Sequence, residues 1–197
     1  MKQPVKTVLV SSAGVLAVVG LVLAPAVASA ITGTTTVNAN VGSAISITTS
    51  GTVNLAITPT GVGSATSASD TVTVTTNHTA GYLLQLNAGA ATLTNGANTL
   101  AATGGTIASP AALSSNSWGF RIDGQAGFGA GPTTAQTNQA SLTGNYAPVP
   151  TTATTVKTTG APATSGDVTS VWYAAKVDTT KPSGAYTGTI TYTATTN

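Results

Sequence analysis

The sequence predicts an all-β protein, a single Ig-like or jelly-roll β-sandwich that follows an N-terminal signal helix. Short stretches that alternate apolar residues with threonine recur along the chain, and glycine, proline and asparagine separate them. No sustained helical period occurs after residue 30. The clearest stretch is 186–194, where Tyr186, Ile190 and Tyr192 alternate with threonines. Because successive side chains of a strand point to opposite faces, this stretch has one apolar face and one hydroxyl face.

Residues 1–30 have the pattern of a secretory signal peptide. Lys2 and Lys6 give a basic start, and residues 8–24 form an apolar run. Ala28-Ser29-Ala30 then fits the small-residue pattern of a processing site. We therefore expect cleavage after Ala30, which leaves residues 31–197 as one secreted domain at the cell surface, outside any membrane. The alternative is a retained membrane helix, but the run is slightly shorter than the ~20 apolar residues that a span needs.

The charge balance of the exported part is neutral. Once Lys2 and Lys6 are removed, the remaining cations equal the aspartates in number, and the chain has no glutamate. A neutral surface lacks the basic patch that phosphate backbones require, so we expect no nucleic-acid partner. Near-zero net charge also permits copies to associate. The chain has no cysteine, so its stability must come from burial and strand pairing, and no lipoprotein anchor is expected.

Five strands are expected in the first half of the chain, at 31–41, 44–48, 52–58, 70–76 and 82–88. The first has its apolar residues at odd positions, and the third does the same with Val53, Leu55 and Ile57 before Pro59 ends it. Residues 60–69 are expected to form a loop. The last two strands are expected to pair through a turn at 77–81.

The second half predicts four further strands, at 117–123, 151–157, 168–177 and 186–194. In the first of these, Trp118, Phe120 and Ile122 share a face opposite Arg121 and Asp123. Residues 92–110 are irregular, with a turn signal at Asn95-Gly96. Residues 124–150, rich in glycine, proline and glutamine, are expected to form a long loop with isolated anchors at Phe128, Leu142 and Tyr146.

Trp172 and Lys176 are the candidate binding residues. If Val171, Tyr173 and the alternate residues after them face inward, Trp172 and Lys176 face outward. An exposed tryptophan is a stacking platform for sugars or an interface residue. The alternative is that a second layer covers Trp172.

Catalytic chemistry has little support in the sequence. His78 is the only histidine, it lies in a turn, and no G-x-S-x-G motif accompanies it. The four aspartates are scattered, and no metal-ligand spacing occurs. We predict no enzyme activity, no catalytic residues, no cofactor and no metal site. Two weaker hypotheses are a hydrolase that uses His78 or an aspartate pair, and a calcium ion between Asp167 and Asp178.

Three short motifs resemble bacterial secreted surface domains of the WxL type. They are Trp118-Gly119-Phe120, the strand at 77–86, and the closing strand at 183–194. Phe120 stands where that family has leucine, and Tyr192 and Ala194 stand where it has tryptophan and leucine. The resemblance implies an Ig-like β-sandwich held noncovalently to the cell wall.

Together these features predict a secreted, non-enzymatic bacterial surface protein, structural or adhesive, whose partner is cell-wall polysaccharide or other copies of itself. One alternative is a carbohydrate-binding module that uses exposed aromatic residues. Another is a pilus-like subunit that forms homo-oligomers or filaments by exchanging the strand at 31–41, because a terminal strand detaches easily and an open sheet edge recruits another chain.

Overall fold

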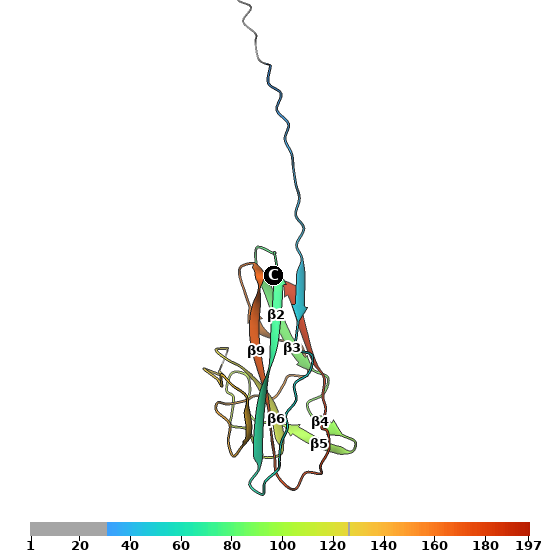
Figure 1. Ribbon diagram of the computed structural model, residues 1–197, viewed down its shortest axis with the longest axis vertical. Coiled ribbons are helices and arrows are strands. Elements are labelled where there is room, and N and C mark those ends of the chain that lie inside the picture. The colour runs from blue at the N-terminus through green and yellow to red at the C-terminus, as the bar shows by residue number, and fades with distance from the viewer. Residues whose placement is uncertain (1–30, 126) are drawn as a thin grey trace, which may run out of the picture. The chain divides into compact units, whose positions relative to one another are not determined.

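The computed structural model describes residues 31–125 and 127–197, which form an all-β protein of two sheets (Figure 1). The predicted signal peptide, residues 1–30, lies outside the described residues. No helix occurs in the described part, so none there is long and apolar enough to cross a membrane. The chain divides after Asn40, and the unit Val41–Asn197 contains every strand of the described residues.

The larger sheet is built around two long antiparallel strands, β2 and β9, which run side by side (Figure 1). Its strand order is β1-β2-β9-β6-β5-β4, and β7 pairs with β2 as well. All pairs are antiparallel except β5 with β6. The strands are β1 (Ile45–Thr48), β2 (Ser64–Thr76), β4 (Leu93–Asn95), β5 (Asn98–Ala102), β6 (Ser117–Ile122), β7 (Gln136–Gln139) and β9 (Ala163–Val177).

The smaller sheet has three antiparallel strands, with β3 (Tyr82–Ala88) between β10 (Ile190–Thr196) and β8 (Thr154–Thr158). Residues of β10 alternate between half-buried and exposed, whereas residues of the central β3 alternate between buried and half-buried. β10 is therefore an outer strand of this sheet, with β3 on one side only.

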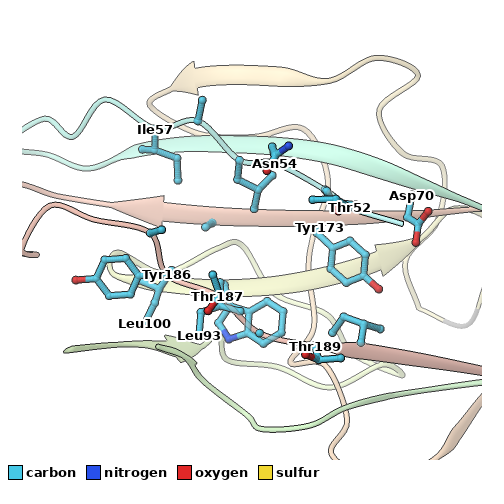
Figure 2. Close-up of a pocket in the computed structure, with 18 of the residues that line it drawn as sticks. Thr52, Asn54, Ile57, Asp70, Leu93, Leu100, Tyr173, Tyr186, Thr187 and Thr189 are labelled. Carbon is cyan, nitrogen blue, oxygen red and sulfur yellow. The ribbon is translucent and has the colours of Figure 1, made fainter. Parts of the chain in front are cut away.

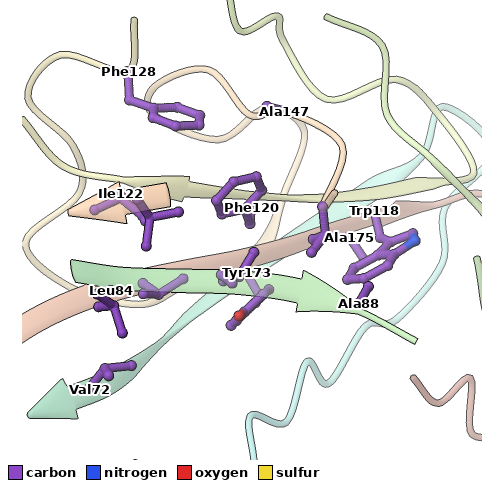
Figure 3. Packing of buried hydrophobic residues seen from close by; sticks show 14 of the residues in the cluster. Val72, Leu84, Ala88, Trp118, Phe120, Ile122, Phe128, Ala147, Tyr173 and Ala175 are labelled. Carbon is purple, nitrogen blue, oxygen red and sulfur yellow. The ribbon is translucent and has the colours of Figure 1, made fainter. Parts of the chain in front are cut away.

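The main core contains apolar side chains from both sheets (Figure 3). Val72 of β2, Leu84 of β3 and Phe120 of β6 are all fully buried. Phe128, from the segment after β6, packs its ring edge against Phe120 with centroids 5.5 Å apart. The predicted alternation on 82–88 and 117–123 thus identified core residues correctly.

The predicted pairing of 70–76 with 82–88 is wrong. β2 belongs to the larger sheet, where it pairs with β1, β7 and β9, whereas β3 belongs to the smaller sheet. The turn between them therefore passes from one sheet to the other. The physical reason is burial: both strands bury their apolar faces in the same core, so each lies in its own sheet instead of sharing one.

Other expectations fared differently along the chain. The strand at 44–48 is confirmed as β1, and Asn95-Gly96 is confirmed as the turn of the β4–β5 hairpin. The strand expected at 31–41 is wrong, because these residues have no regular structure. The loop expected at 60–69 is partly wrong, because β2 begins at Ser64. Residues 52–58 keep the predicted alternation of burial but pair with no strand in the described chain.

Residues 124–150 form a covering layer over the outer face of the larger sheet. The segment contains the short strand β7, and Ala147 forms a bridge with Phe120. The guanidinium of Arg121, on the outer face, is bonded to main-chain carbonyls of this segment. All six residues of β6 are consequently buried, on both faces.

Candidate functional site

The expectation that Trp172 faces solvent is wrong, since its exposed fraction is 5%. Its position on the outer face is as the alternation predicts: it lies opposite Ser69 on β2 and Arg121 on β6. The covering segment 124–150, bonded to Arg121, makes this outer face a second interior. Lys176 is half-buried, and its aliphatic stem lies against Gly63. The two residues do not form an exposed binding platform.

His78 is half-buried in the turn after β2, and its Nδ1 is buried without a hydrogen-bond partner in the described chain. Each aspartate is bonded to a partner of its own. Asp123 pairs with Arg121, and Asp167 pairs with Lys157. Asp178 caps the turn after β9 by accepting bonds from Thr180 and Asn116. No described serine or aspartate side chain is bonded to the His78 ring.

The calcium hypothesis for Asp167 and Asp178 fails on geometry. Asp167 lies within β9 and Asp178 directly follows its last residue, so eleven steps of a strand separate them. At a strand rise of ~3.3 Å per residue their Cα atoms stand on the order of 36 Å apart. One cation cannot bridge them. In the described chain no group of three or more histidine, cysteine or acidic side chains is placed to hold a metal.

An elongated groove of about 980 Å³ lies within the described part of the chain (Figure 2). Two stretches supply its walls: most of residues 47–59, which include the end of β1, and residues 181–192, which include the start of β10. Figure 2 shows Thr52 and Ile57 on the first wall and Tyr186, Thr187 and Thr189 on the second. The volume is at the upper end of the ~300–1,000 Å³ typical of small-ligand pockets.

The floor of the groove is apolar and its rim is polar. Trp118, Tyr173 and Ala175 of the larger sheet are buried beneath it, with Leu93 and Leu100 alongside. The walls add the half-buried side chains of Val53, Leu55, Ile57, Tyr186 and Ile190. Between these, threonine and asparagine side chains stand exposed at the rim. Such a surface fits a chain with one apolar and one polar face.

The first wall has unpaired main-chain donors. Within the described residues, the N–H groups of residues 52–57 donate no hydrogen bond. The neighbouring strand β2 bonds this wall mainly through side chains: Thr66 Oγ1 donates to the Ala56 carbonyl, and Asp70 accepts from the Ser50 N–H. β2 cannot pair with it continuously, because β1 and β7 already occupy the two ends of the same β2 edge.

The second wall is partly paired. Thr187 and Thr94 exchange main-chain hydrogen bonds, and the Thr189 carbonyl accepts a bond from the Gly89 N–H. β10 continues the wall and pairs only with β3 among the described strands. Two extended segments therefore face each other across an apolar floor, each with main-chain groups available.

A hydrogen bond between two tyrosines joins the sheets at one end of the groove. The hydroxyls of Tyr173 on β9 and Tyr192 on β10 are 2.7 Å apart, and Asp70 lies close to both. Burial is the main cause that raises the pKa of Tyr192 far above its usual range, and the Tyr173 hydroxyl and the Asp70 carboxylate raise this pKa further. Burial likewise raises the pKa of Tyr173.

The Tyr192→Phe variant is expected to reduce the alkaline sensitivity of the fold. Tyr192 in the unfolded chain loses its proton near pH 10, whereas the folded protein keeps it, so its contribution is complete below about pH 10 and is lost as the pH rises. Removing the hydroxyl should make the fall of the unfolding free energy above pH 10 shallower by up to ~1.4 kcal/mol per pH unit. Urea unfolding at pH 8, 10 and 11 measures this slope, and equal slopes for both proteins would contradict the assignment.

The sequence patterns missed the groove. They predicted both walls as strands, from the alternation at 52–58 and at 186–194. Alternation reports that one face of an extended segment is buried, but it does not report which strand lies beside it. The main-chain groups that the two walls leave unpaired are visible only once both sheets are assembled.

The groove can bind an extended polypeptide by two physical means. Its floor can bury alternate apolar side chains, and its walls can bond the main chain, as in the addition of a strand to a sheet edge. No carboxylate pair or nucleophile–base pair lines it, since Asp70 is its single acidic residue. No protein-family model, curated protein or solved structure matches this chain.

Proposed function

We propose that this chain is an exported, non-enzymatic structural or adhesive protein of the bacterial cell exterior, and that its groove binds an extended polypeptide segment. The observation that carries the proposal is a lack of strand pairing at the groove: the N–H groups of residues 52–57 have no hydrogen-bond partner in the described chain, above an apolar floor. One more strand between the two walls would supply the missing hydrogen-bond partners and cover the apolar floor. The proposed architecture is an Ig-like β-sandwich, as the WxL resemblance implies.

Several features of the sequence support a position outside the cell. The first thirty residues have the pattern of a secretory signal, and the exported part has zero net charge and a surface rich in threonine. These properties suit a protein that stays at a surface and contacts its neighbours. The alternative of a carbohydrate-binding module loses its best residue, because Trp172 is buried.

A charge placed in the groove is expected to release the protein from the cell surface. Leu55 is half-buried and lines the groove, so Leu55→Asp would put a carboxylate against the apolar floor. We expect this variant to move from the surface fraction to the culture medium when the producing cells are fractionated. The matched control is Thr58→Asp, which adds the same charge at an exposed residue outside the groove.

Circular dichroism and a urea unfolding curve establish that both variants remain folded before they are compared. Surface retention of Leu55→Asp equal to that of Thr58→Asp would show that the groove is not the means of attachment. A wild-type protein found only as a free monomer in the medium would refute the structural role itself.

A further inference from the structure

Residues 31–41, here called the tail, present an unusual set of exposed apolar side chains. Ile31 is 96% exposed, and Val37 and Val41 are each 86% exposed. All three stand at odd positions, with Ala39, while threonine and asparagine occupy most even positions. If the tail became extended, it would have one apolar and one polar face. That is the pattern that the groove floor and rim accommodate.

We propose that the groove is filled by the tail of a second copy of this chain, which adds a strand between the two walls. The inference rests on the proposed function, because it names the polypeptide that the groove binds. The lengths are compatible: the eleven residues of the tail span ~35 Å when extended, and the first wall, residues 47–59, is slightly longer.

The main chain of the tail complements that of the walls. It forms no strand in the structure, so its N–H and C=O groups are available along its length. The tail contains no proline, and every residue of it can donate to a wall. It also contains no charged residue, so no charge would be buried on the apolar floor.

The root of the tail is held extended by Asn77. The Asn77 Nδ2 donates to the Gly42 carbonyl at 2.9 Å, and its Oδ1 accepts from the Ala44 N–H at 2.7 Å. These bonds continue the antiparallel pairing of β1 with β2 past the start of β1. The chain can therefore reverse its direction only at residues before Gly42.

This restriction prevents a tail from filling the groove of its own chain. A reversal at residues 38–41 would place residues 31–37 beside 42–48, because a hairpin pairs residues at equal distances from its turn. The unpaired N–H groups of the first wall begin only at residue 52, beyond that reach. The tail of another copy has no such constraint, and the zero net charge of the exported chain does not oppose its approach.

One tail and one groove per chain give a head-to-tail contact, in which each copy donates to one neighbour and accepts from another. Contacts of this type extend into filaments unless the rotation between copies closes a ring. The surface protein proposed above would then be a polymer held together by inserted strands.

The test uses the exported protein with paired substitutions in the tail and the groove. Val37→Asp places a charge on the apolar face of the tail, and Asn38→Asp adds the same charge on its polar face. Both residues are exposed, so neither change should affect the stability of the free monomer. The weight-average mass is measured by light scattering after size-exclusion chromatography at increasing protein concentration. Asn38→Asp should assemble like the unmodified chain, and the rise of mass with concentration should be at least tenfold smaller for Val37→Asp.

A mixing experiment then identifies the partners. Leu55→Asp keeps an intact tail and Val37→Asp keeps an intact groove, so each should be monomeric alone. Because the chain has no cysteine, the two can be unfolded in guanidinium chloride, mixed and refolded without disulfide scrambling. The mixture should contain a 1:1 dimer that does not grow further.

Two results would overturn the inference: assembly of Val37→Asp equal to that of Asn38→Asp, or a mixture that stays monomeric. Either result, together with loss of surface retention by Leu55→Asp, would leave the groove as a polypeptide site with a different occupant. Full surface retention of Leu55→Asp would instead refute the proposed function itself.

Discussion

Replacing Arg121 with methionine is expected to lower the free energy of unfolding by about 3–5 kcal/mol, because the guanidinium joins the larger sheet to its covering layer. The side chain is fully buried. Its Nε donates to Asp123 at 2.8 Å, and its Nη2 donates to the carbonyls of Phe128 at 3.0 Å and Ala130 at 2.9 Å. Methionine fills similar space but leaves these buried carbonyls without a donor.

Lys157→Met is the matched control for this variant, since it also removes one positive charge from an ion pair. Lys157 lies 2.7 Å from Asp167, but the two side chains are 19% and 31% exposed, so the pair is partly screened by solvent. We expect it to cost about 1 kcal/mol. Urea unfolding curves of the two variants measure the difference, and equal costs would mean that the bonds from Arg121 to the covering segment contribute little.

The second interior under segment 124–150 explains why an arginine can be buried there. The ring of Tyr146 lies 5.9 Å from the guanidinium carbon, within the range of a cation–π contact. Gly144, with a φ of 84°, lies so close to the guanidinium that a Cβ there would collide with it. The segment is therefore shaped around the arginine, with main-chain carbonyls and an aromatic face replacing water.

The sequence was informative wherever one face of a strand meets the core. Trp118, Phe120 and Ile122 were predicted to share a buried face, and they do. The anchors predicted in the long loop were right for Phe128 and Tyr146, which are buried. In each case a large apolar side chain among small polar ones indicates burial without any knowledge of the partner strand.

The sequence was uninformative about which layer covers which. Residues 64–69 consist of serine, alanine and one threonine, and only the threonine is of a type enriched in strands. They nevertheless extend β2, because β9 and β7 pair with its two edges there. Arg121 was placed correctly on the outer face, but a charged residue on that face is expected to be exposed to solvent. It is buried because segment 124–150 covers it, and the sequence of this glycine-rich segment has no periodic pattern that would predict this.

The candidate site shows the same limit in another form. Val53, Leu55 and Ile57 were predicted to line one face of a strand, and they line the groove, but no strand of the described chain pairs with them. The period of a sequence measures what one segment buries. A missing neighbour becomes apparent only from the hydrogen bonds that the assembled sheets leave unmade.

Trp172 belongs to the second interior and not to the main core. Four buried apolar residues lie outside the main cluster, namely Ala65, Tyr146, Trp172 and Ala174. Trp172 lies directly opposite Arg121 in the register of β9 with β6. Its indole Nε1 is buried and has no hydrogen-bond partner in the described chain. The residue therefore acts through its volume, which separates the sheet from the covering segment.

Trp172→Ala is accordingly expected to destabilise the protein by about 3–5 kcal/mol, since it removes a large side chain from a closed interior and leaves a cavity. Trp172→Phe keeps most of the aromatic volume and loses no hydrogen bond, so it should cost less than about 1.5 kcal/mol. Urea unfolding measures both, with the remaining Trp118 as the fluorescent probe. A surface tryptophan would give the opposite pattern, with Trp172→Ala costing less than about 0.5 kcal/mol, and that result would mean that segment 124–150 does not pack over β9.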